Sequence, residues 1–299
     1  MTHTPATQPR LGRLATAMVT AFNEDGSLDL DGVRRLATEL VDEQANDSVV
    51  VNGTTGESPT TTEDEKFAVV AATLEAVGDR ANVIAGVGSF DTAHTVRMAK
   101  RAEQTGAHGL LVVTPYYSRP VQDGIIAHFR AVADATDLPV MVYDIPGRTA
   151  TAIEADTLIA LAEHPNIVAV KDAKGDVVSS SRVIAETGLD YYAGDDAITL
   201  PLMSVGGVGV VGTSTHFTGR GMREIIDAVV AGDYPRALAA HRRWLPAFTR
   251  VFGAPGCCTV KGGLRAEGRG VGSVRLPMVA APEAVVTAFL DALHTAEQG

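Results

Sequence analysis

A single lysine ends an otherwise apolar, branched stretch of the sequence. The segment NIVAVKDAKGD, residues 166–176, has the composition of a buried strand, and Lys171 stands near its end. Burial of an ammonium group is costly, and desolvation lowers the pKa of a lysine because it disfavours the charged form. A neutral amine can attack a carbonyl carbon and form a Schiff base. The alternative for this residue taken alone is a lysine that reaches the solvent at the strand end; Lys174 and Lys66, outside the strand, are interpreted as solvated.

Schiff-base chemistry also needs groups that move protons, and this sequence offers hydroxyl side chains. Tyr143 lies in YDIPGRT, Thr54 and Thr55 lie in NGTTGES, and Tyr116 and Tyr117 lie in TPYYSRP. A chain of hydroxyl groups can relay a proton without holding a charge. For Tyr143 the alternative is an aromatic core residue.

Two further features are suited to binding carboxylates. The two glycines of GTTGES, residues 53–58, let backbone amides approach an anion. Arg148 in IPGRT can grip a second carboxylate with its planar guanidinium, although a surface position is the default for an arginine. The run GVGVVG, residues 207–212, matches a dinucleotide motif but lies within a predicted strand, so we do not interpret it as one.

These residues follow apolar segments that alternate with amphipathic stretches along the chain. Strands without polar alternation are typical of parallel sheets buried on both faces. Catalytic groups of a (β/α)8 barrel lie at the C-terminal ends of its strands, where the candidates above stand. We therefore predict an α/β fold, a (β/α)8 TIM barrel, with a doubly wound open sheet as the alternative. The predicted strands are residues 14–22, 47–53, 82–88, 109–115, 138–146, 166–173, 191–196 and 207–214.

The strand pattern also divides the chain. Residues 1–13 are predicted to be a flexible leader, 14–232 the catalytic barrel, and 233–299 a C-terminal helical domain that serves packing or subunit assembly. Within that domain, KGGL (residues 261–264) places two glycines inside a predicted helix. Each glycine should weaken the helix by about 1 kcal/mol relative to alanine. The sequence alone gives no reason for them.

Composition excludes several classes of function. The 299 residues carry a net charge of −11 without a basic cluster, which argues against nucleic-acid binding. No apolar segment approaches the roughly 20 residues of a membrane helix, and no signal peptide is evident, so we expect a cytoplasmic protein. Cys257 and Cys258 are adjacent and close no useful disulfide loop. The histidines are scattered and no CxxC occurs, so we predict neither a metal nor a cofactor.

The ordered motifs NGTTGES, TPYYSRP, YDIPGRT, VAVKDAKGD and AGDDA resemble those of the dihydrodipicolinate synthases, in the pyruvate-dependent class I aldolase superfamily. VRLPM in the tail is similar as well. The resemblance implies a homotetramer, a dimer of dimers, that makes 4-hydroxy-tetrahydrodipicolinate from pyruvate and aspartate 4-semialdehyde. This is a lyase step of lysine and diaminopimelate biosynthesis.

The same resemblance implies roles for individual residues. Lys171 would form the pyruvate imine and Tyr143 would shuttle protons. Thr55 would link Tyr143 to Tyr117, which in the family reaches into the site of the neighbouring subunit.

It also implies a set of substrate-binding residues. Thr54 and Thr55 would hold the carboxylate of pyruvate, and Arg148 that of the semialdehyde. The backbone at Gly194 and Val211 would line the pocket.

The sequence departs from the family pattern in two places. GTSTHFTG, with Thr215 and His216, replaces a segment that ends in alanine-asparagine, so we expect a difference on the second-substrate side or at the start of the next helix. Glu63, Lys66 and His94 stand where lysine-inhibited members have histidines and a glutamate. We therefore expect weak or absent feedback inhibition by lysine.

Two other functions remain open at this point. A related pyruvate-dependent lyase would use the same lysine and tyrosine but accept a sugar acid or another aldehyde. Arg148 favours a carboxylated acceptor, since a polyol would need neutral hydrogen-bonding groups. A non-catalytic sensor of small acids is the third hypothesis, but a sensor needs no imine-forming lysine.

Overall fold

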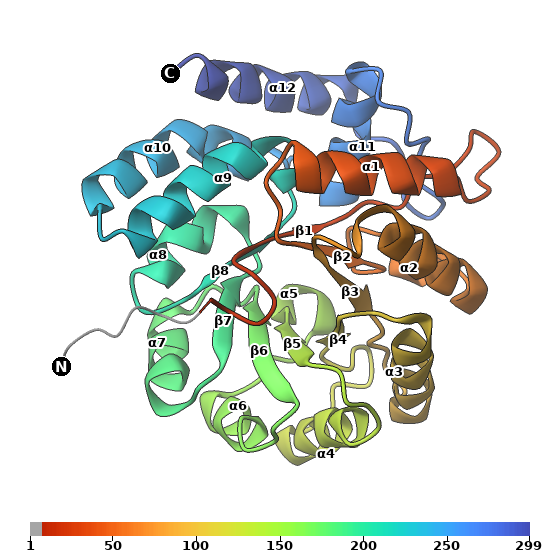
Figure 1. Cartoon of the computed structure of the whole chain (residues 1–299), viewed down its shortest axis with the longest axis vertical. Helices are drawn as coiled ribbons and strands as arrows, with labels where there is room; N and C mark the ends of the chain where they lie inside the picture. The colour runs from red at the N-terminus through yellow and green to blue at the C-terminus, as the bar shows by residue number, and fades with distance from the viewer. Residues whose placement is uncertain (1–7) are drawn as a thin grey trace.

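The structure is a computed structural model and describes residues 8–299. Eight parallel strands form a closed barrel in sequence order, and β8 pairs with β1 to complete the ring (Figure 1). The predicted (β/α)8 barrel is thus confirmed, and the open sheet is wrong. The strands are β1 (Leu14–Ala17), β2 (Ser48–Val51), β3 (Asn82–Gly86), β4 (Gly109–Val113), β5 (Val140–Asp144), β6 (Ile167–Asp172), β7 (Asp190–Ala193) and β8 (Gly209–Gly212).

The strands are shorter than the predicted segments because the last residues of several segments leave the sheet and turn over the barrel mouth. Thr20, for example, lies beyond β1 and donates its hydroxyl to the carbonyl of Gly56 at 2.7 Å. The predicted leader, residues 1–13, falls partly on residues 1–7, which lie outside the described residues. The division of the chain into leader, barrel and C-terminal domain stays a prediction.

Helices follow the strands and cover the outside of the barrel. Several begin where a side chain caps the first turn: Asp29, Asp91 and Asp176 accept from backbone amides, and Thr62 and Glu65 form a capping box. The helices around the barrel are α1 (Leu30–Asp42), α2 (Glu63–Val77), α3 (Thr92–Thr105), α4 (Gln122–Ala133), α6 (Ala155–Leu161), α7 (Val177–Glu186), α8 (Thr199–Met203) and α9 (Thr215–Val230), and the loops after β2, β5 and β7 hold the short η1 (Ser58–Thr60), α5 (Pro146–Thr149) and η2 (Asp196–Ile198).

The apolar faces of the helices are buried against the barrel, as expected for the amphipathic stretches of the sequence. Met222, Ile225 and Ile226 of α9 are buried, as are the main stripe residues of α1. Val230, the last residue of α9, is exposed. A second apolar cluster fills the barrel interior and includes Tyr143 and Val211.

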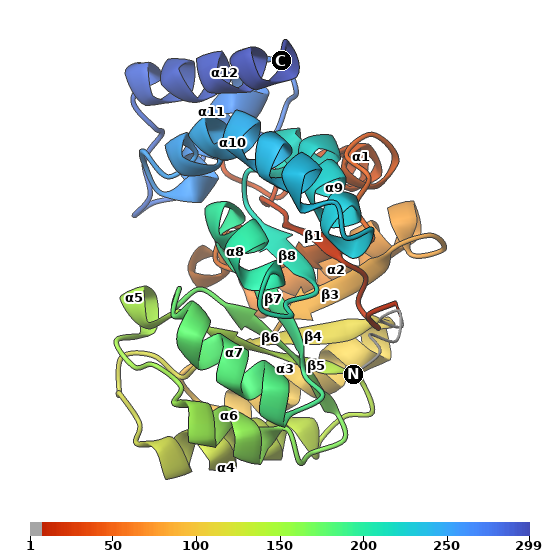
Figure 2. The ribbon, with the colours of Figure 1, turned by 90° about the vertical axis from the view of Figure 1, so that its left-hand side faces the viewer.

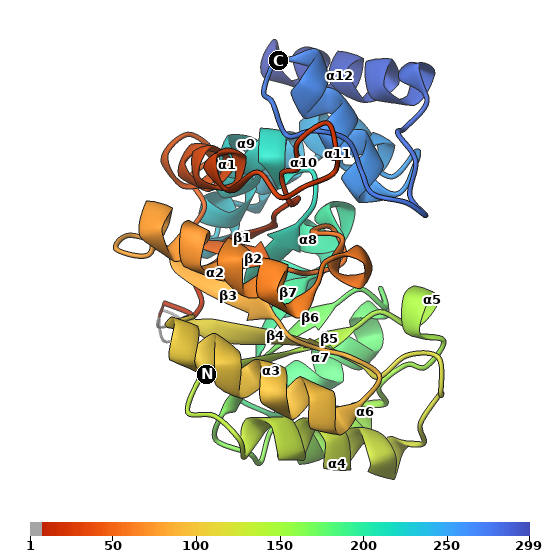
Figure 3. The same cartoon turned by 90° about the vertical axis from the view of Figure 1, so that its right-hand side faces the viewer.

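The C-terminal segment is helical, as predicted. It comprises α10 (Tyr234–Arg250), α11 (Gly256–Ala266) and α12 (Glu283–Glu297). α10 packs against α9 and α12, and α12 packs against α11. The three C-terminal helices α10, α11 and α12 therefore lie together at one side of the barrel (Figures 2 and 3). The structure explains the glycines of KGGL: a Cβ on Gly262 would lie 2.6 Å from Val286 Cγ2, and one on Gly263 would lie 3.0 Å from Phe217. They let α11 pack closely on its neighbours.

Candidate active site

Lys171 lies inside the barrel rather than on its rim. It is on β6, its side chain is buried with 4% of its surface exposed, and β-sheet register pairs it with Tyr143 on β5. The Nζ atom lies 4.3 Å from the centroid of the Tyr143 ring, a cation–π distance when the amine is charged. The interpretation of Lys171 as a solvated strand end is therefore wrong.

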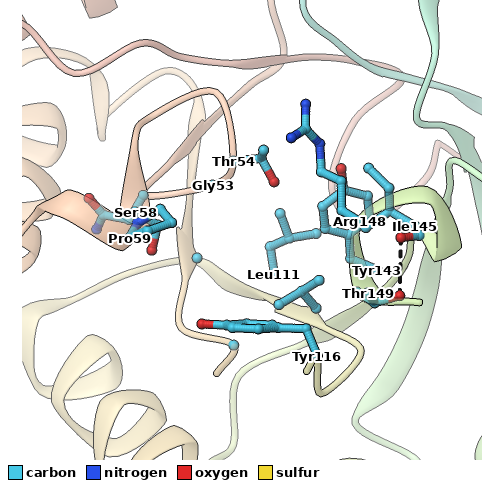
Figure 4. A pocket seen from close by; sticks show the side chains of 14 residues that line it. Gly53, Thr54, Ser58, Pro59, Leu111, Tyr116, Tyr143, Ile145, Arg148 and Thr149 are labelled. Carbon is cyan, nitrogen blue, oxygen red and sulfur yellow. Dashed lines mark hydrogen bonds between the residues drawn. The ribbon is translucent and has the colours of Figure 1, made fainter. Parts of the chain in front are cut away.

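A cavity of about 300 Å³ opens above Lys171 at the mouth of the barrel. Thr54, Thr55, Tyr143 and Gly194 line it together with Lys171, so residues from four different strands or their loops meet there. An adjoining hollow of about 240 Å³ shares several of the same residues, and Figure 4 shows how they surround it. The shared lining residues are Thr54, Pro59, Tyr143, Ile145 and Arg148.

The GTTGES loop presents Thr54 and Thr55 to the cavity because its backbone is fixed in an unusual shape. Glu57 has a φ of 58°, in the left-handed region. A Cβ on Gly56 would lie 3.1 Å from both the Asn52 nitrogen and the Met18 oxygen, so the loop packs against the backbone at the end of β2 and just after β1. This packing explains the glycine at that position.

Arg148 lies on the opposite side of the same opening. The short helix α5 begins at Pro146 immediately after the β5 loop and carries Arg148 on its exposed side. The guanidinium projects over the cavity near Thr54 and Tyr143 (Figure 4). It is thus placed to meet the anionic end of a molecule that has entered the cavity.

Of the remaining predicted pocket residues, Gly194 lines the cavity that residues 8–299 form and Val211 does not. Gly194 lines the cavity, and a Cβ there would lie 2.9 Å from the Ala173 Cβ, so a side chain would crowd the wall. Val211 is fully buried in the same interior cluster as Tyr143 and is not among the residues that line the cavity in the described part of the chain. That its backbone lines the pocket stays a prediction.

Tyr117 does not contribute to the cavity of its own chain. It has a φ of 71°, and 94% of its surface is exposed. Its neighbour Tyr116 turns inward, lines the smaller hollow, and packs edge-to-face against Phe90 with ring centroids 5.4 Å apart. Burial raises the pKa of Tyr116.

An ionic network lies behind the site, on the outer face of β5 and β6. Lys174 Nζ lies 3.7 Å from Asp144 Oδ2, and Ser180 donates its hydroxyl to Asp172. Burial raises the pKa of Asp144 to about 6, although Lys174 opposes the shift. The prediction that Lys174 is solvated is wrong, since only 15% of its side chain is exposed.

Lys66 was also predicted to be solvated, and this is wrong as well. Its Nζ donates to the carbonyl of Ser58 at 2.8 Å and to that of Thr61. Burial lowers the pKa of Lys66. The lysine thereby bridges α2 to the turn after the GTTGES loop, where the Ser58 carbonyl also accepts from the Thr61 hydroxyl at 3.2 Å.

Comparison with known proteins places the fold and the site in a family. The model of the dihydrodipicolinate synthetase family matches residues 10–296. The chain belongs to the dihydrodipicolinate synthetase family. The family predicted from the motifs is thereby confirmed.

Curated relatives and solved structures agree with this assignment. The 4-hydroxy-tetrahydrodipicolinate synthase of Cutibacterium acnes is 61% identical over 94% of this chain and 96% of its own length, and that of Acidothermus cellulolyticus is 60% identical over 90% and 87%. The lysine-bound synthase of Cyanidioschyzon merolae superposes with a TM-score of 0.94 at 39% identity, covering 97% of this chain and 99% of that one. The Acinetobacter baumannii synthase, solved with pyruvate, gives 0.92 at 32% identity, covering 96% and 99%.

The departure from the dihydrodipicolinate synthase pattern at Thr215 and His216 lies at the start of α9. His216 Nδ1 lies 2.8 Å from the Thr213 carbonyl, and its Nε2 accepts from the Val19 amide at 3.1 Å. Thr16 Oγ1 and Thr215 Oγ1 are 2.7 Å apart. These contacts join the start of α9 to β1 and to Val19, which follows that strand in the chain. An effect on the second-substrate side stays a prediction.

Some cavity residues were missed by the sequence analysis because they come from the C-terminal segment. Phe252, Cys257, Pro277 and Met278 line the cavity that holds Lys171. Burial raises the pKa of Cys257 to about 12, so its thiol stays protonated at neutral pH. The VRLPM motif, residues 274–278, contains Pro277 and Met278 and was a signal that could have found these two.

Two negative findings apply to residues 8–299. No cluster of three or more histidine, cysteine or acidic side chains is arranged to hold a metal ion in this part of the chain. Within the same residues, no helix has the length and apolar character needed to cross a membrane.

Proposed function

We propose that this chain is a 4-hydroxy-tetrahydrodipicolinate synthase that condenses pyruvate with aspartate 4-semialdehyde. The observation that carries the proposal is the buried Lys171 amine, which lies 4.3 Å from the Tyr143 ring and faces a cavity lined by Thr54 and Thr55. Curated relatives that are 53% to 61% identical bear the name of this enzyme.

The chemistry begins with the Lys171 amine. It adds to the ketone carbon of pyruvate, and the carbinolamine loses its hydroxyl as water to leave an imine. The protonated imine draws electrons from the adjacent methyl carbon, which loses a proton and becomes a nucleophilic enamine carbon. This carbon forms the new bond to the aldehyde carbon. The amino group of the bound semialdehyde then attacks the imine carbon, closes the ring and releases Lys171.

Each of these steps moves a proton, and Tyr143 is the nearest candidate carrier. Its ring lies beside the Lys171 amine, and the residue lines the same cavity as Thr55. We assign the transfer between the amine and the substrate oxygen to Tyr143, with Thr55 linking it to Tyr117 of a second copy of the chain. A hydroxyl relay of this kind needs no charged intermediate.

The two substrates carry carboxylates, and the site has a separate group for each. We assign the carboxylate of pyruvate to the amides and hydroxyls of Thr54 and Thr55, which line the same cavity as Lys171. Arg148 lies further out, where the second substrate must enter. A bidentate guanidinium contact discriminates between a carboxylated acceptor and a neutral sugar chain.

We propose that the enzyme works as a homotetramer, a dimer of dimers. Tyr117 is 94% exposed, and the nearby apolar side chains Phe90 and Val121 are exposed too. A second copy covering this surface would bury them and bring its own Tyr117 toward the relay. Sedimentation analysis of the wild type and of Tyr117→Ala tests this assembly.

Turnover measurements test the function directly. Purified protein should convert pyruvate and aspartate 4-semialdehyde into the cyclic product, detected by mass spectrometry. Lys171→Ala should abolish the product, whereas Lys100→Ala, at an exposed position on α3, should retain it. A preference for aldehydes of sugar acids, or turnover retained in Lys171→Ala, would contradict the proposal.

A further inference from the structure

We propose that Lys261 is a positioning residue, whose buried ion pair with Glu57 holds the GTTGES loop in the shape that binds the keto-acid carboxylate. The inference rests on the proposed function, because it concerns the same pyruvate site. It gives the C-terminal helices a part in catalysis beyond packing and assembly.

The ion pair joins two segments that are distant in the sequence. Lys261 Nζ on α11 lies 2.6 Å from Glu57 Oε1, and only 2% and 1% of the two side chains are exposed. Lys261 also donates to the Ser273 carbonyl at 2.9 Å and lies 4.1 Å from the centroid of the Phe22 ring. Loss of either partner would leave an unpaired charge in the interior, which is strongly unfavourable.

Glu57 transmits this contact to the loop. It follows Thr55 by two residues, its backbone is left-handed, and its amide donates to the Thr54 carbonyl at 3.2 Å. Its second carboxylate oxygen accepts from the Arg275 amide at 2.8 Å. The carboxylate is thus held from two sides by the C-terminal segment, and the turn that presents Thr54 and Thr55 is fixed with it.

The same helix also forms part of the cavity wall. Gly256 and Cys257, in the first turn of α11, line the cavity together with Thr54 and Thr55. Lys261 stands one turn further along the helix. Helix α11 therefore contacts the cavity through its first turn and the GTTGES loop through Lys261.

A role in positioning is distinguishable from a role in stability alone. A buried ion pair contributes little stability compared with well-packed neutral groups, but it fixes one geometry. Replacing both partners by neutral groups should therefore restore stability without restoring the loop. Glu57→Gln combined with Lys261→Met removes both charges while keeping similar side-chain volumes. Arg265→Met, on the same helix but at the surface, is the matched control.

For each variant, the experiment measures two quantities. One is the pyruvate concentration that half-saturates borohydride trapping on Lys171, and the other is the midpoint temperature of thermal unfolding. Lys261→Met should lower the midpoint and raise the half-saturating pyruvate concentration by about tenfold, as expected for a misplaced binding group. The double variant should regain most of the midpoint but keep the raised concentration. The KM for aspartate semialdehyde at saturating pyruvate should change less than about twofold, since its group is Arg148.

The outcomes separate this inference from the proposed function. If wild-type protein forms no pyruvyl adduct, the proposed function fails whatever the variants do. If the wild type is trapped but the double variant regains both the midpoint and the wild-type pyruvate concentration, the pair is only structural and the inference fails. It also fails if neither Lys261→Met nor the double variant folds, because the pair is then a folding requirement.

Discussion

Lys171 and Tyr143 are register partners on adjacent strands, and the lysine Nζ lies 4.3 Å from the centre of the tyrosine ring. Neighbouring residues in register on parallel strands point to the same face of the sheet, so both side chains enter the barrel. The residues that follow them, Asp144 and Asp172, are also register partners and take part in the network of Lys174 and Ser180. The strand pair β5 and β6 thus carries Tyr143 and Lys171 on its inner face and Asp144 and Asp172 on its outer face.

Removal of the Tyr143 hydroxyl separates proton transfer from packing. Tyr143→Phe keeps the ring over Lys171, so we expect the protein to fold normally and to bind pyruvate. Loss of the proton carrier should reduce kcat/KM by about 10²-fold or more, the range typical of general acid–base groups. Tyr192→Phe is the control, because that interior hydroxyl bonds to the Gly12 carbonyl instead. Equal losses in the two variants would point to packing.

Arg148 should act on the second substrate only. Arg148→Ala removes the guanidinium from the rim of the cavity, and we expect KM for aspartate semialdehyde to rise at least about tenfold, the scale of a lost charge-assisted contact. Pyruvate trapping on Lys171 should be unchanged, because the Thr54–Thr55 loop is untouched. A parallel loss of pyruvate trapping would place Arg148 at the first substrate.

His216 should make the stability of the protein depend on pH. Burial lowers the pKa of His216 from 6.5 to about 4, because the charged imidazole loses its water. The unprotonated Nε2 accepts from the Val19 amide. The unfolded chain binds this proton more readily, so stability is lost as the pH falls from about 6.5 toward 4. Between pH 7 and pH 5 the wild type should lose about 2 kcal/mol more than His216→Asn. Urea unfolding at the two pH values measures this.

The exposed His294 provides the control for that comparison. His294→Asn should follow the wild type at both pH values. If His216→Asn loses as much stability on acidification as the wild type, the buried imidazole is not the source of the pH dependence.

Feedback inhibition by lysine should be weak. Glu63, Lys66 and His94 stand at the positions that match the lysine pocket of inhibited family members. His94 pairs with Glu63 at 3.3 Å. The Lys66 ammonium already donates to the carbonyls of Ser58 and Thr61. A fixed cation there disfavours a second amine. Initial rates at saturating substrates should change little at millimolar lysine. Strong, saturable inhibition would show that another set of residues binds the effector.

The barrel and the centre of the site were predictable because they depend on local patterns. Unbroken apolar strands indicate a parallel sheet, and a lysine at a strand end must either leave the barrel or enter it. Strand order then places Tyr143 beside Lys171. Arg148 and the GTTGES loop follow from the rule that functional loops lie at the carboxyl ends of the strands.

The contacts that were missed depend on the tertiary packing of distant segments. No local pattern shows that Lys261 reaches Glu57, or that Lys174 turns back to Asp144. A charged residue in a loop or on a helix face is expected to be solvated, and only the tertiary packing of distant segments shows that it is buried. Tyr117 is the opposite case, because its surroundings would be supplied by another copy of the chain.

The most direct test of the central claim is borohydride reduction in the presence of pyruvate, followed by mass spectrometry of the peptide that contains Lys171. The account predicts a reduced pyruvyl adduct on Lys171 that requires pyruvate and is absent from Lys171→Ala. An unmodified Lys171 peptide, or an adduct on another lysine with full activity retained, would contradict it.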